Sequence, residues 1–457
     1  MKKLLCLLWC VPVLVLGLPV NSIAQNGSLD ASFHAEANAT VRAIAVQTNG
    51  QLLIGGDFTS VNGVPRNRIA RLNGDGELDR TFNPGTGASD LIYSVALQSD
   101  GKVLIGGRFT VYDGTPRNRI ARLNADGSLD TSFDVGAGAN DEVFAVAVQT
   151  NGQVLIAGGF TSINTSNRSR IARLNNDGSV DANFDTNRVD DRALCLVVQP
   201  NGRILIGGYF STIGGTPRNG IARLRSDGSL DISFYPAPGP SGSVTSIALQ
   251  HDGKILVAGN FPTVNGTRRG IGRLNADGSL DTGFNPGSGA DGTIFSIALQ
   301  QDGKVVLGGL FGVVNGASRT AIARLNADGS LDTTFVPGLG PKSQYSPWVF
   351  SVVVQDDGRT LLGGDFTHVN GVARVRLASL NSDALAPAAT LSLKMYAGLT
   401  IEGQTGITYR IEYTSILTNQ TLWQTLTDLP LSNSPQFFLD TTSPFSTRRF
   451  YRAVTLP

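Results

Sequence analysis

Arginine and aspartate residues recur eight positions apart in this 457-residue chain, and they form its most regular set of charged pairs. A guanidinium directly opposite a carboxylate on a hairpin contributes about 0.2–1 kcal/mol, and more where the contact is bidentate and shielded from water. We therefore interpret the pairs as cross-strand clamps rather than as catalytic groups. The pairs are Arg71 with Asp79, Arg122 with Asp130, Arg173 with Asp181, Arg223 with Asp231, Arg273 with Asp281, and Arg324 with Asp332.

Sequence motifs for catalysis and metal binding are absent. The three histidines, His34, His251 and His368, are far apart and lack the spacing of zinc ligands. No Gly-x-Ser-x-Gly, His-Glu-x-x-His or P-loop motif occurs. The recurrent Asn-x-Asp-Gly-Ser-Leu-Asp text could suggest a calcium loop, but calcium loops carry more carboxylates and a late bidentate acid. Turn capping explains these residues better, so we expect no metal, no cofactor and no enzyme activity.

A second arginine stands five positions before each of the six paired arginines, and a seventh stands five positions before Ser379. Seven such cations at the same position of successive repeats would attract a polyanion such as an acidic glycan. An arginine in such a place more often bonds the carbonyls of its own loop or of a neighbour, and we favour this structural role while both interpretations stay open. The residues are Arg66, Arg117, Arg168, Arg218, Arg268 or Arg269, Arg319 and Arg374.

The elements that must position the clamps are short hairpins. Residues 119–133 predict two strands joined by the turn Asn124-Ala125-Asp126-Gly127. This text fits a type I turn closed by a glycine in the left-handed region, because Gly127 adopts a positive φ without a Cβ clash. The turn fixes the register, so that Asn124 faces Ser128, Leu123 faces Leu129, and Arg122 faces Asp130.

A second hairpin precedes the first in every repeat, and its turn begins with a glutamine. These glutamines follow one another at intervals of 51, 51, 50, 51, 50 and 55 residues. Each repeat holds four short strands and no helical period, which at this repeat length predicts a blade of a β-propeller. We therefore expect an all-β, seven-bladed propeller whose blades are marked by Gln47, Gln98, Gln149, Gln199, Gln250, Gln300 and Gln355.

The seventh repeat stops after its third strand, at Leu377–Asn381, and lacks the expected Gly-Ser-Leu-Asp-x-Ser-Phe text. That text stands at the other end of the chain, as Gly27–Phe33. The simplest arrangement is a closed ring in which this N-terminal strand completes the last blade, because closure removes the open sheet edges. A linear array of seven blades is the alternative, and it leaves the strand without a partner.

The text Arg-Ile-Ala-Arg-Leu-Asn-x-Asp-Gly-Ser-Leu-Asp-x-Ser-Phe, together with Asp-Gly-Lys-Val-Leu-Ile-Gly-Gly, resembles the delta-60 repeat family of predicted β-propellers. The resemblance covers residues 26–383, with a period shorter than the family name suggests. It implies the propeller fold. It implies no particular activity, because the family carries no established ligand or reaction.

Residues 388–457 depart from the repeat text and resemble a fibronectin-type or similar β-sandwich module, most clearly in Tyr409–Tyr413 and Arg449–Arg452. Docking or surface attachment is the use that such a module implies. The expected strands are Thr390–Leu399, Ile407–Tyr413, Trp423–Leu426, Gln436–Leu439 and Phe450–Val454.

Residues 1–24 have the features of a secretory signal peptide, with two lysines, an apolar run and a small-residue cleavage text. An uncleaved membrane anchor is the alternative, which two prolines in the run weaken. Without this segment only Cys195 remains of the cysteines, so no disulfide framework is expected. The net charge of +1 argues against a broad basic surface for nucleic acid. We expect a secreted monomer, in the periplasm, at the cell surface or outside the cell, with no transmembrane segment after cleavage.

The variable loops that lead into each blade are the expected binding region. Tight turns occupy one face of the disc, so these longer loops share the other face, and function concentrates on variable loops held by a rigid frame. The longest is Val336–Trp348, and an exposed Trp or Tyr is a typical binding anchor. A Trp348 that is buried at the start of the innermost strand is the alternative. We expect a glycan or protein ligand, with a glycan-active hydrolase or lyase as the alternative function. The candidate ligand-binding residues are Lys342, Tyr345, Trp348, Asp90, Asp141 and Asp191.

Overall fold

The computed structural model describes residues 26–184, 188–236, 239–262, 270–344, 346–381, 397–401, 404–414, 422–433, 436–440 and 450–456. The predicted signal peptide and Tyr345 lie outside these residues. The chain divides into two compact units, Met1–Leu385 and Ala386–Pro457. The described part consists of strands, turns and loops without a helix, and thus has no helix that could cross a membrane.

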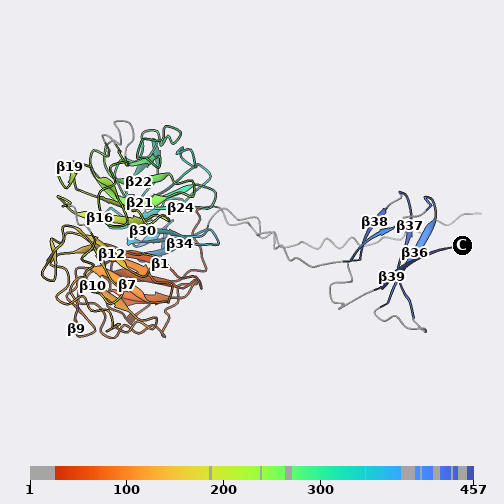
Figure 1. Cartoon of the computed structure of the whole chain (residues 1–457), viewed down its shortest axis with the longest axis horizontal. Coiled ribbons are helices and arrows are strands. Elements are labelled where there is room, and N and C mark those ends of the chain that lie inside the picture. Colours follow the sequence, from red (N-terminus) through yellow and green to blue (C-terminus); the bar gives the residue numbers. More distant parts are fainter. Residues whose placement is uncertain are drawn as a thin grey trace, which may run out of the picture. The chain divides into compact units, whose positions relative to one another are not determined.

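The first unit is built from three-stranded antiparallel sheets, one for each of the seven repeats (Figure 1). The middle strand of each sheet is buried on both of its faces, as its run of Val, Ile, Leu and Gly requires when a blade packs between two neighbours. The inner strands of successive blades contact one another around a complete cycle, and β30 contacts β1. The predicted all-β, seven-bladed propeller is therefore confirmed.

The inner strands are β1 (Val41–Val46), β6 (Ile92–Leu97), β11 (Val143–Val148), β16 (Ala193–Val198), β21 (Ser243–Leu249), β24 (Thr293–Leu299) and β30 (Trp348–Val354). The middle strands are β2 (Leu52–Gly56), β7 (Val103–Gly107), β12 (Val154–Gly158), β17 (Ile204–Gly208), β22 (Ile255–Asn260), β25 (Val305–Leu310) and β31 (Thr360–Asp365). The third strands are β5 (Ile69–Leu72), β10 (Ile120–Leu123), β15 (Ile171–Leu174), β20 (Ile221–Leu224), β23 (Ile271–Leu274), β28 (Ile322–Leu325) and β34 (Leu377–Leu380).

The fourth strand of each blade is shorter than the sequence predicts. The register is the expected one, because Leu123 bridges Leu129 and the Asp130 N–H donates to the Arg122 carbonyl at 2.9 Å. The ladder ends there, since the Asp130 carboxylate accepts the backbone N–H and the hydroxyl of Ser132. A side chain that bonds the backbone two residues on competes with strand pairing. The predicted strand is therefore a single bridge followed by a turn.

Short two-residue hairpins, which the sequence did not lead us to expect, follow most middle strands and bridge the segment that enters the same blade, as in Ala37 with Val61. In the last blade that segment forms β29 (Pro341–Lys342), which pairs with the hairpin. The hairpins are β3 (Ser60–Val61) with β4 (Val64–Pro65), β8 (Val111–Tyr112) with β9 (Thr115–Pro116), β13 (Ser162–Ile163) with β14 (Ser166–Asn167), β18 (Thr212–Ile213) with β19 (Thr216–Pro217), β26 (Val313–Val314) with β27 (Ala317–Ser318), and β32 (His368–Val369) with β33 (Val372–Ala373).

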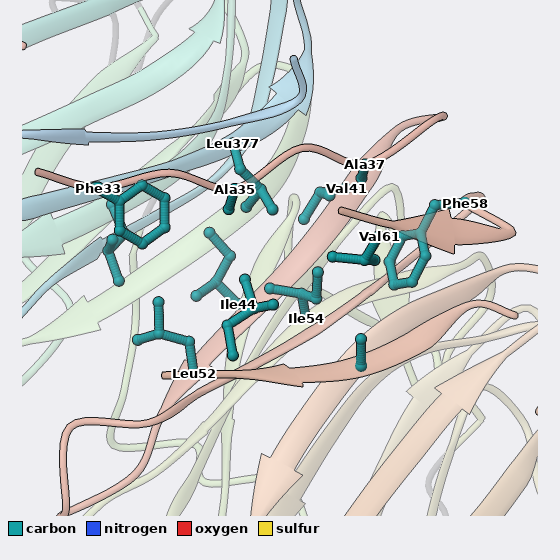
Figure 2. Packing of buried hydrophobic residues seen from close by; sticks show 13 residues of the cluster. Phe33, Ala35, Ala37, Val41, Ile44, Leu52, Ile54, Phe58, Val61 and Leu377 are labelled. Atoms are coloured by element: carbon teal, nitrogen blue, oxygen red, sulfur yellow. The ribbon is translucent and has the colours of Figure 1, made fainter. Parts of the chain in front are cut away.

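The N-terminal segment closes the ring, as predicted. Leu29 bridges Leu380 of β34, and backbone N–H groups of Gly27 and Asp30 donate to the last blade at 2.7 and 2.8 Å. Figure 2 shows Phe33 in the layer between the last and first blades, together with Leu377 and Leu52. Phe33 is fully buried there.

Four of the five predicted strands lie within the described residues of the second unit, whereas residues 390–396 of the predicted strand Thr390–Leu399 lie outside them. The observed strands are β35 (Ala397–Ile401), which pairs with β38 (Gln436–Asp440), and β36 (Thr408–Thr414), which lies between β37 (Gln424–Pro430) and β39 (Phe450–Thr455). Ile411 and Leu431 are buried in a small core. Arg410 and Asp428 form a bidentate ion pair across β36 and β37. The resemblance to a fibronectin-type module stays a prediction.

Candidate ligand-binding site

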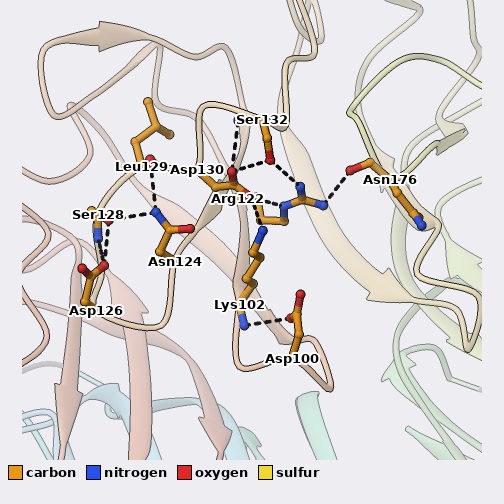
Figure 3. A network of polar contacts seen from close by, with 10 residues as sticks. All are labelled: Asp100, Lys102, Arg122, Asn124, Asp126, Ser128, Leu129, Asp130, Ser132 and Asn176. Atoms are coloured by element: carbon orange, nitrogen blue, oxygen red, sulfur yellow. Dashed lines mark hydrogen bonds and ion pairs between the residues drawn. The ribbon is translucent and has the colours of Figure 1, made fainter.

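The predicted arginine–aspartate clamps are buried, and they join each blade to the next. Arg122 Nε donates to Asp130 at 2.7 Å, while a terminal nitrogen donates to the carbonyl of Asn176 in the following blade at 2.8 Å (Figure 3). The guanidinium carbon also lies 4.6 Å from the centre of the Phe133 ring. The same Nε–carboxylate contact, at 2.6–2.8 Å, occurs in all six predicted pairs. These contacts make the clamps part of a rigid frame.

Two aspartates of the clamps show how strongly this environment favours the ionised carboxylate. Burial opposes ionisation of Asp79, but hydrogen bonds from Thr81 and Arg71 outweigh it and lower the pKa to about 2. The pKa of Asp231 is lowered to about 2 in the same way, by Ser233 and Arg223 against burial. In the last blade Ser379 and Arg359 both donate to Asp30 at 3.1 Å and take the place of the missing clamp arginine.

The second set of arginines bonds the backbone of its own loops. Arg66 and Arg117 each donate to the carbonyl of the preceding proline at 2.9 Å, and Arg319 and Arg374 make the equivalent contact. Arg268 and Arg269 lie outside the described residues. The guanidinium groups that the structure describes thus take part in loop contacts, as the structural interpretation requires.

The two faces of the disc differ. Strands within a blade are antiparallel, so the Gln-initiated turns and the Asn-x-Asp-Gly turns lie together on one face, which we call the turn face. The inner strands begin at the opposite face, which we call the mouth face because the central channel opens there between them. Trp348 is the first residue of β30 and therefore lies at the mouth face.

Aromatic side chains gather where the inner strands begin. The ring centres of Phe295 and Phe350 are 5.0 Å apart, and Trp348 lies 5.8 and 5.4 Å from them. Tyr93 and Phe144 form a second pair, with ring centres 5.3 Å apart. These distances are typical of favourable aromatic contacts between neighbouring blades.

Arg42 of β1 connects the two aromatic groups. Its guanidinium carbon lies 4.7 Å from the centre of the Phe350 ring and 5.5 Å from that of Tyr93. Asp57 accepts from the same guanidinium at 3.2 Å. A cation over aromatic rings is stabilised by their quadrupoles. We call this continuous set of side chains the collar: Arg42, Tyr93, Phe144, Phe295, Trp348 and Phe350.

A second carboxylate, that of Glu142, also contacts the collar through a hydrogen bond. The Tyr93 hydroxyl donates to Glu142 of the next blade at 3.1 Å. Burial raises the pKa of Tyr93 to about 12, and the negative charge of Glu142 contributes to the same effect. The phenol therefore stays protonated and acts as a hydrogen-bond donor.

The predicted ligand-binding residues lie in different parts of the structure. Trp348 is part of the collar and 39% exposed. Lys342 is exposed on β29 and pairs with His368, in a different sheet from Trp348. The acidic residues precede inner strands at the mouth face, where Asp90 binds Arg108 at 2.8 Å while Asp141 and Asp191 each accept the N–H of the next residue. A ligand role for Lys342, Tyr345, Asp90, Asp141 and Asp191 stays a prediction.

The sequence-based prediction did not include the other five collar residues, although the sequence carries a signal for them. Five of the six collar residues stand five positions before a marker glutamine, where neighbouring positions are uniformly small or aliphatic. The residue type at this position changes from blade to blade: Arg42, Tyr93, Phe144, Leu194, Thr245, Phe295 and Phe350.

The family model described as "Domain of unknown function (DUF5122) beta-propeller" matches residues 47–82, 98–133, 149–184, 199–234, 250–284, 300–335 and 355–383. The chain belongs to this family. Every match begins at one of the marker glutamines, so the family's repeat coincides with the repeat read from the sequence. The predicted membership of a repeat β-propeller family is thereby confirmed, while residues 388–457 lie outside the matches.

Solved structures with the same fold have low sequence identity. The WD40 β-propeller domain of Doa1 is 15% identical, with a TM-score of 0.51 over 77% of this chain and 95% of that chain. U3-55K is 14% identical, with a TM-score of 0.51 over 77% of this chain and 99% of that chain. A virginiamycin B lyase from Staphylococcus aureus is 13% identical, with a TM-score of 0.46 over 76% of this chain and 97% of that chain. The likenesses to Doa1 and U3-55K show the fold alone, and no curated protein matches the chain.

Proposed function

We propose that the protein is an exported, non-enzymatic binding or scaffold protein that takes its ligand at the mouth of the propeller's central channel. The collar is the observation that carries this proposal. Its aromatic rings are only partly buried, and they lie on inner strands that pair with the almost completely buried middle strands of their blades. Export rests on the signal-like text of residues 1–24.

Partly exposed aromatic rings leave apolar surface in contact with water, and a ligand that covers this surface gains binding energy. Burial of apolar surface contributes about 25 cal/mol per Å², so a ligand that covers several rings gains binding energy from each of them. Rigid aromatic anchors also lose little conformational freedom on binding. The clamps and the closed ring keep the collar in place, as a preformed site requires.

Trp348 supplies a direct assay of ligand binding at the collar. The chain contains three tryptophans, of which Trp9 lies in the predicted signal peptide and Trp423 in the second unit. Expression from residue 25 with Trp423→Phe therefore leaves Trp348 as the single reporter. We expect saturable quenching or a blue shift of its emission with soluble oligosaccharides or peptides. We expect Phe295→Ala to weaken that response about tenfold, because it removes a ring beside Trp348.

Ile232→Ala provides the control, since Ile232 is an exposed apolar residue next to a clamp aspartate rather than at the mouth. It should leave the affinity unchanged. Ligands that bind the protein without any change in Trp348 emission would contradict a site at the collar.

A glycan-active enzyme is the second candidate, because a phenol and a carboxylate meet at the mouth in Tyr93 and Glu142. A hydrolase or lyase requires such convergent acid and base groups. The raised pKa of Tyr93 leaves almost no phenolate at neutral pH to act as a general base, which favours binding over proton abstraction. Incubation with polysaccharides, followed by assays of reducing ends and of unsaturated products, separates the two. Turnover that Glu142→Gln abolishes would establish the enzyme, and no turnover is the result that the binding function predicts.

A further inference from the structure

A pocket of about 470 Å³ lies between the fourth and fifth blades, beside the channel mouth. Tyr209 follows the last residue of β17, and Asn260 ends β22, so both lie where middle strands reach the mouth face. Gly208 pairs with Ala193, the first residue of β16, and Asn260 pairs with Ser243, the first residue of β21. The pocket therefore continues the rim of the mouth across the two blades in which Leu194 and Thr245 occupy the collar position.

An arginine side chain that four other blades place at this position is absent from the fourth blade. Gly220 has a φ of 67°, and the equivalent residue in four other blades is an arginine in the same left-handed conformation. The guanidinium groups of these arginines donate to carbonyls just after the middle strand, as Arg119 does to Phe109 and Arg376 to Phe366. In the fourth blade Gly220 donates its N–H to the matching carbonyl of Phe210 but places no side chain there.

The described side chains that line the pocket are polar or apolar and carry no charge. Tyr209 is 55% exposed and offers a ring face, while Asn219, Asn260 and Ser243 supply amides and a hydroxyl, and Pro240 adds apolar surface. Amide and hydroxyl groups act both as donors and as acceptors, which matches the hydroxyls of a sugar. The apolar face of a sugar ring packs on an aromatic side chain. Among the described residues that line the pocket, none has a charged side chain that could select an acidic sugar or a cationic side chain.

We propose that this pocket is a subsite for an uncharged sugar residue of a glycan chain that extends over the collar. The inference rests on the proposed ligand site at the mouth and names the class of ligand. Tyr209 is the stacking platform, and Gly220 provides the space. The aromatic rings on the opposite part of the rim, around Trp348, bind further sugar rings of the same chain.

Gly220→Arg is the sharpest test, because it restores the residue that fills this position in four other blades. An added Cβ would approach the Gly242 carbonyl to 2.8 Å, so a small backbone shift is needed. Tyr209→Ala is the second variant, and it demands no such shift. Ile232→Ala is the control, since Ile232 is an exposed apolar residue, at 70%, that follows the clamp aspartate Asp231 and does not line the pocket.

The experiment measures calorimetric binding of uncharged glucose, mannose and galactose hexasaccharides to the full chain. Oligogalacturonate, chitosan oligomers and uncharged peptides serve as comparison ligands. We expect at least one neutral hexasaccharide to bind, with affinity reduced about tenfold or more by Gly220→Arg and by Tyr209→Ala. Ile232→Ala should have no effect, and thermal melts should show that all variants fold.

Three outcomes would overturn the subsite. They are no binding of any neutral hexasaccharide at about 1 mM, binding of only charged oligosaccharides or peptides, and an unchanged affinity in a folded Gly220→Arg variant. If affinity then still depends on Phe295 and Trp348 emission still responds, the proposed function stands without the sugar subsite. If glycan affinity depends on Gly220 while Trp348 emission never responds, the pocket binds the ligand and the collar does not.

Discussion

Replacement of Phe33 by alanine tests whether the N-terminal segment completes the last blade. Phe33 is fully buried in the layer between the last and first blades, although it is far in sequence from the seventh repeat. Removal of a buried phenylalanine side chain costs about 3–5 kcal/mol, through lost burial and the cavity left behind. The equivalent residue Phe133 is also fully buried, between two blades that are each continuous in the chain. Phe133→Ala is therefore a matched control.

Equilibrium urea unfolding provides the measurement. Trp348 emission in the Trp423→Phe background reports the propeller, because Trp423 belongs to the second unit. If the ring is closed as described, Phe33→Ala and Phe133→Ala lower the free energy of unfolding by amounts that agree within about 1 kcal/mol. A loss of several kcal/mol for Phe133→Ala beside almost none for Phe33→Ala would show that the ring is closed in another way.

The clamps and the single thiol give three further predictions. The pKa of Asp79 is depressed to about 2 from its usual 3.8. The ionised carboxylate therefore stabilises the folded protein fully above about pH 4, and this contribution is lost as the pH falls from about 4 to 2. A melting temperature that drops mainly between pH 7 and 5 would contradict this. Arg71→Ala should cost about 3–5 kcal/mol of unfolding free energy, because it leaves Asp79 beside the neutral amide of Gln51, which donates at 2.9 Å, without its charged partner. Arg122→Ala should cost clearly less, because the charged Lys102 remains 2.9 Å from Asp130; equal losses in urea titrations would refute the argument. Desolvation raises the pKa of the Cys195 thiol to about 12, so this half-buried thiol should react with Ellman's reagent at pH 8 far more slowly in the native protein than after unfolding, and equal rates would contradict the raised pKa.

Local chemistry explains why the blades were predictable. The turn at Asn124–Gly127 needs only a capping side chain and a glycine at positive φ, and Gly127 has a φ of 89°. Repetition of that text, and the displaced copy at Gly27–Phe33, then specified the number of blades and the ring closure. The early end of the fourth strand was harder to predict, because the strength of the contact between the Asp130 and Ser132 side chains depends on geometry that the sequence does not contain.

The collar was not predictable by strand alternation. Each inner strand contains an irregularity near its start, such as the shift between Ile92 and Ser94 in β6. A bulge of this kind changes which side chains face the channel, so the two-residue period before it does not continue after it. The sequence also did not reveal that Arg68 and Arg119 adopt positive φ, a conformation that favours glycine and that the rest of the blade must enforce.

A crystal structure of the protein with a bound neutral hexasaccharide would test the central claim most directly. The account predicts sugar density on the mouth face, with one ring in the pocket beside Tyr209 and others against Trp348 and Phe295. Density confined to the turn face, or to the second unit, would contradict it.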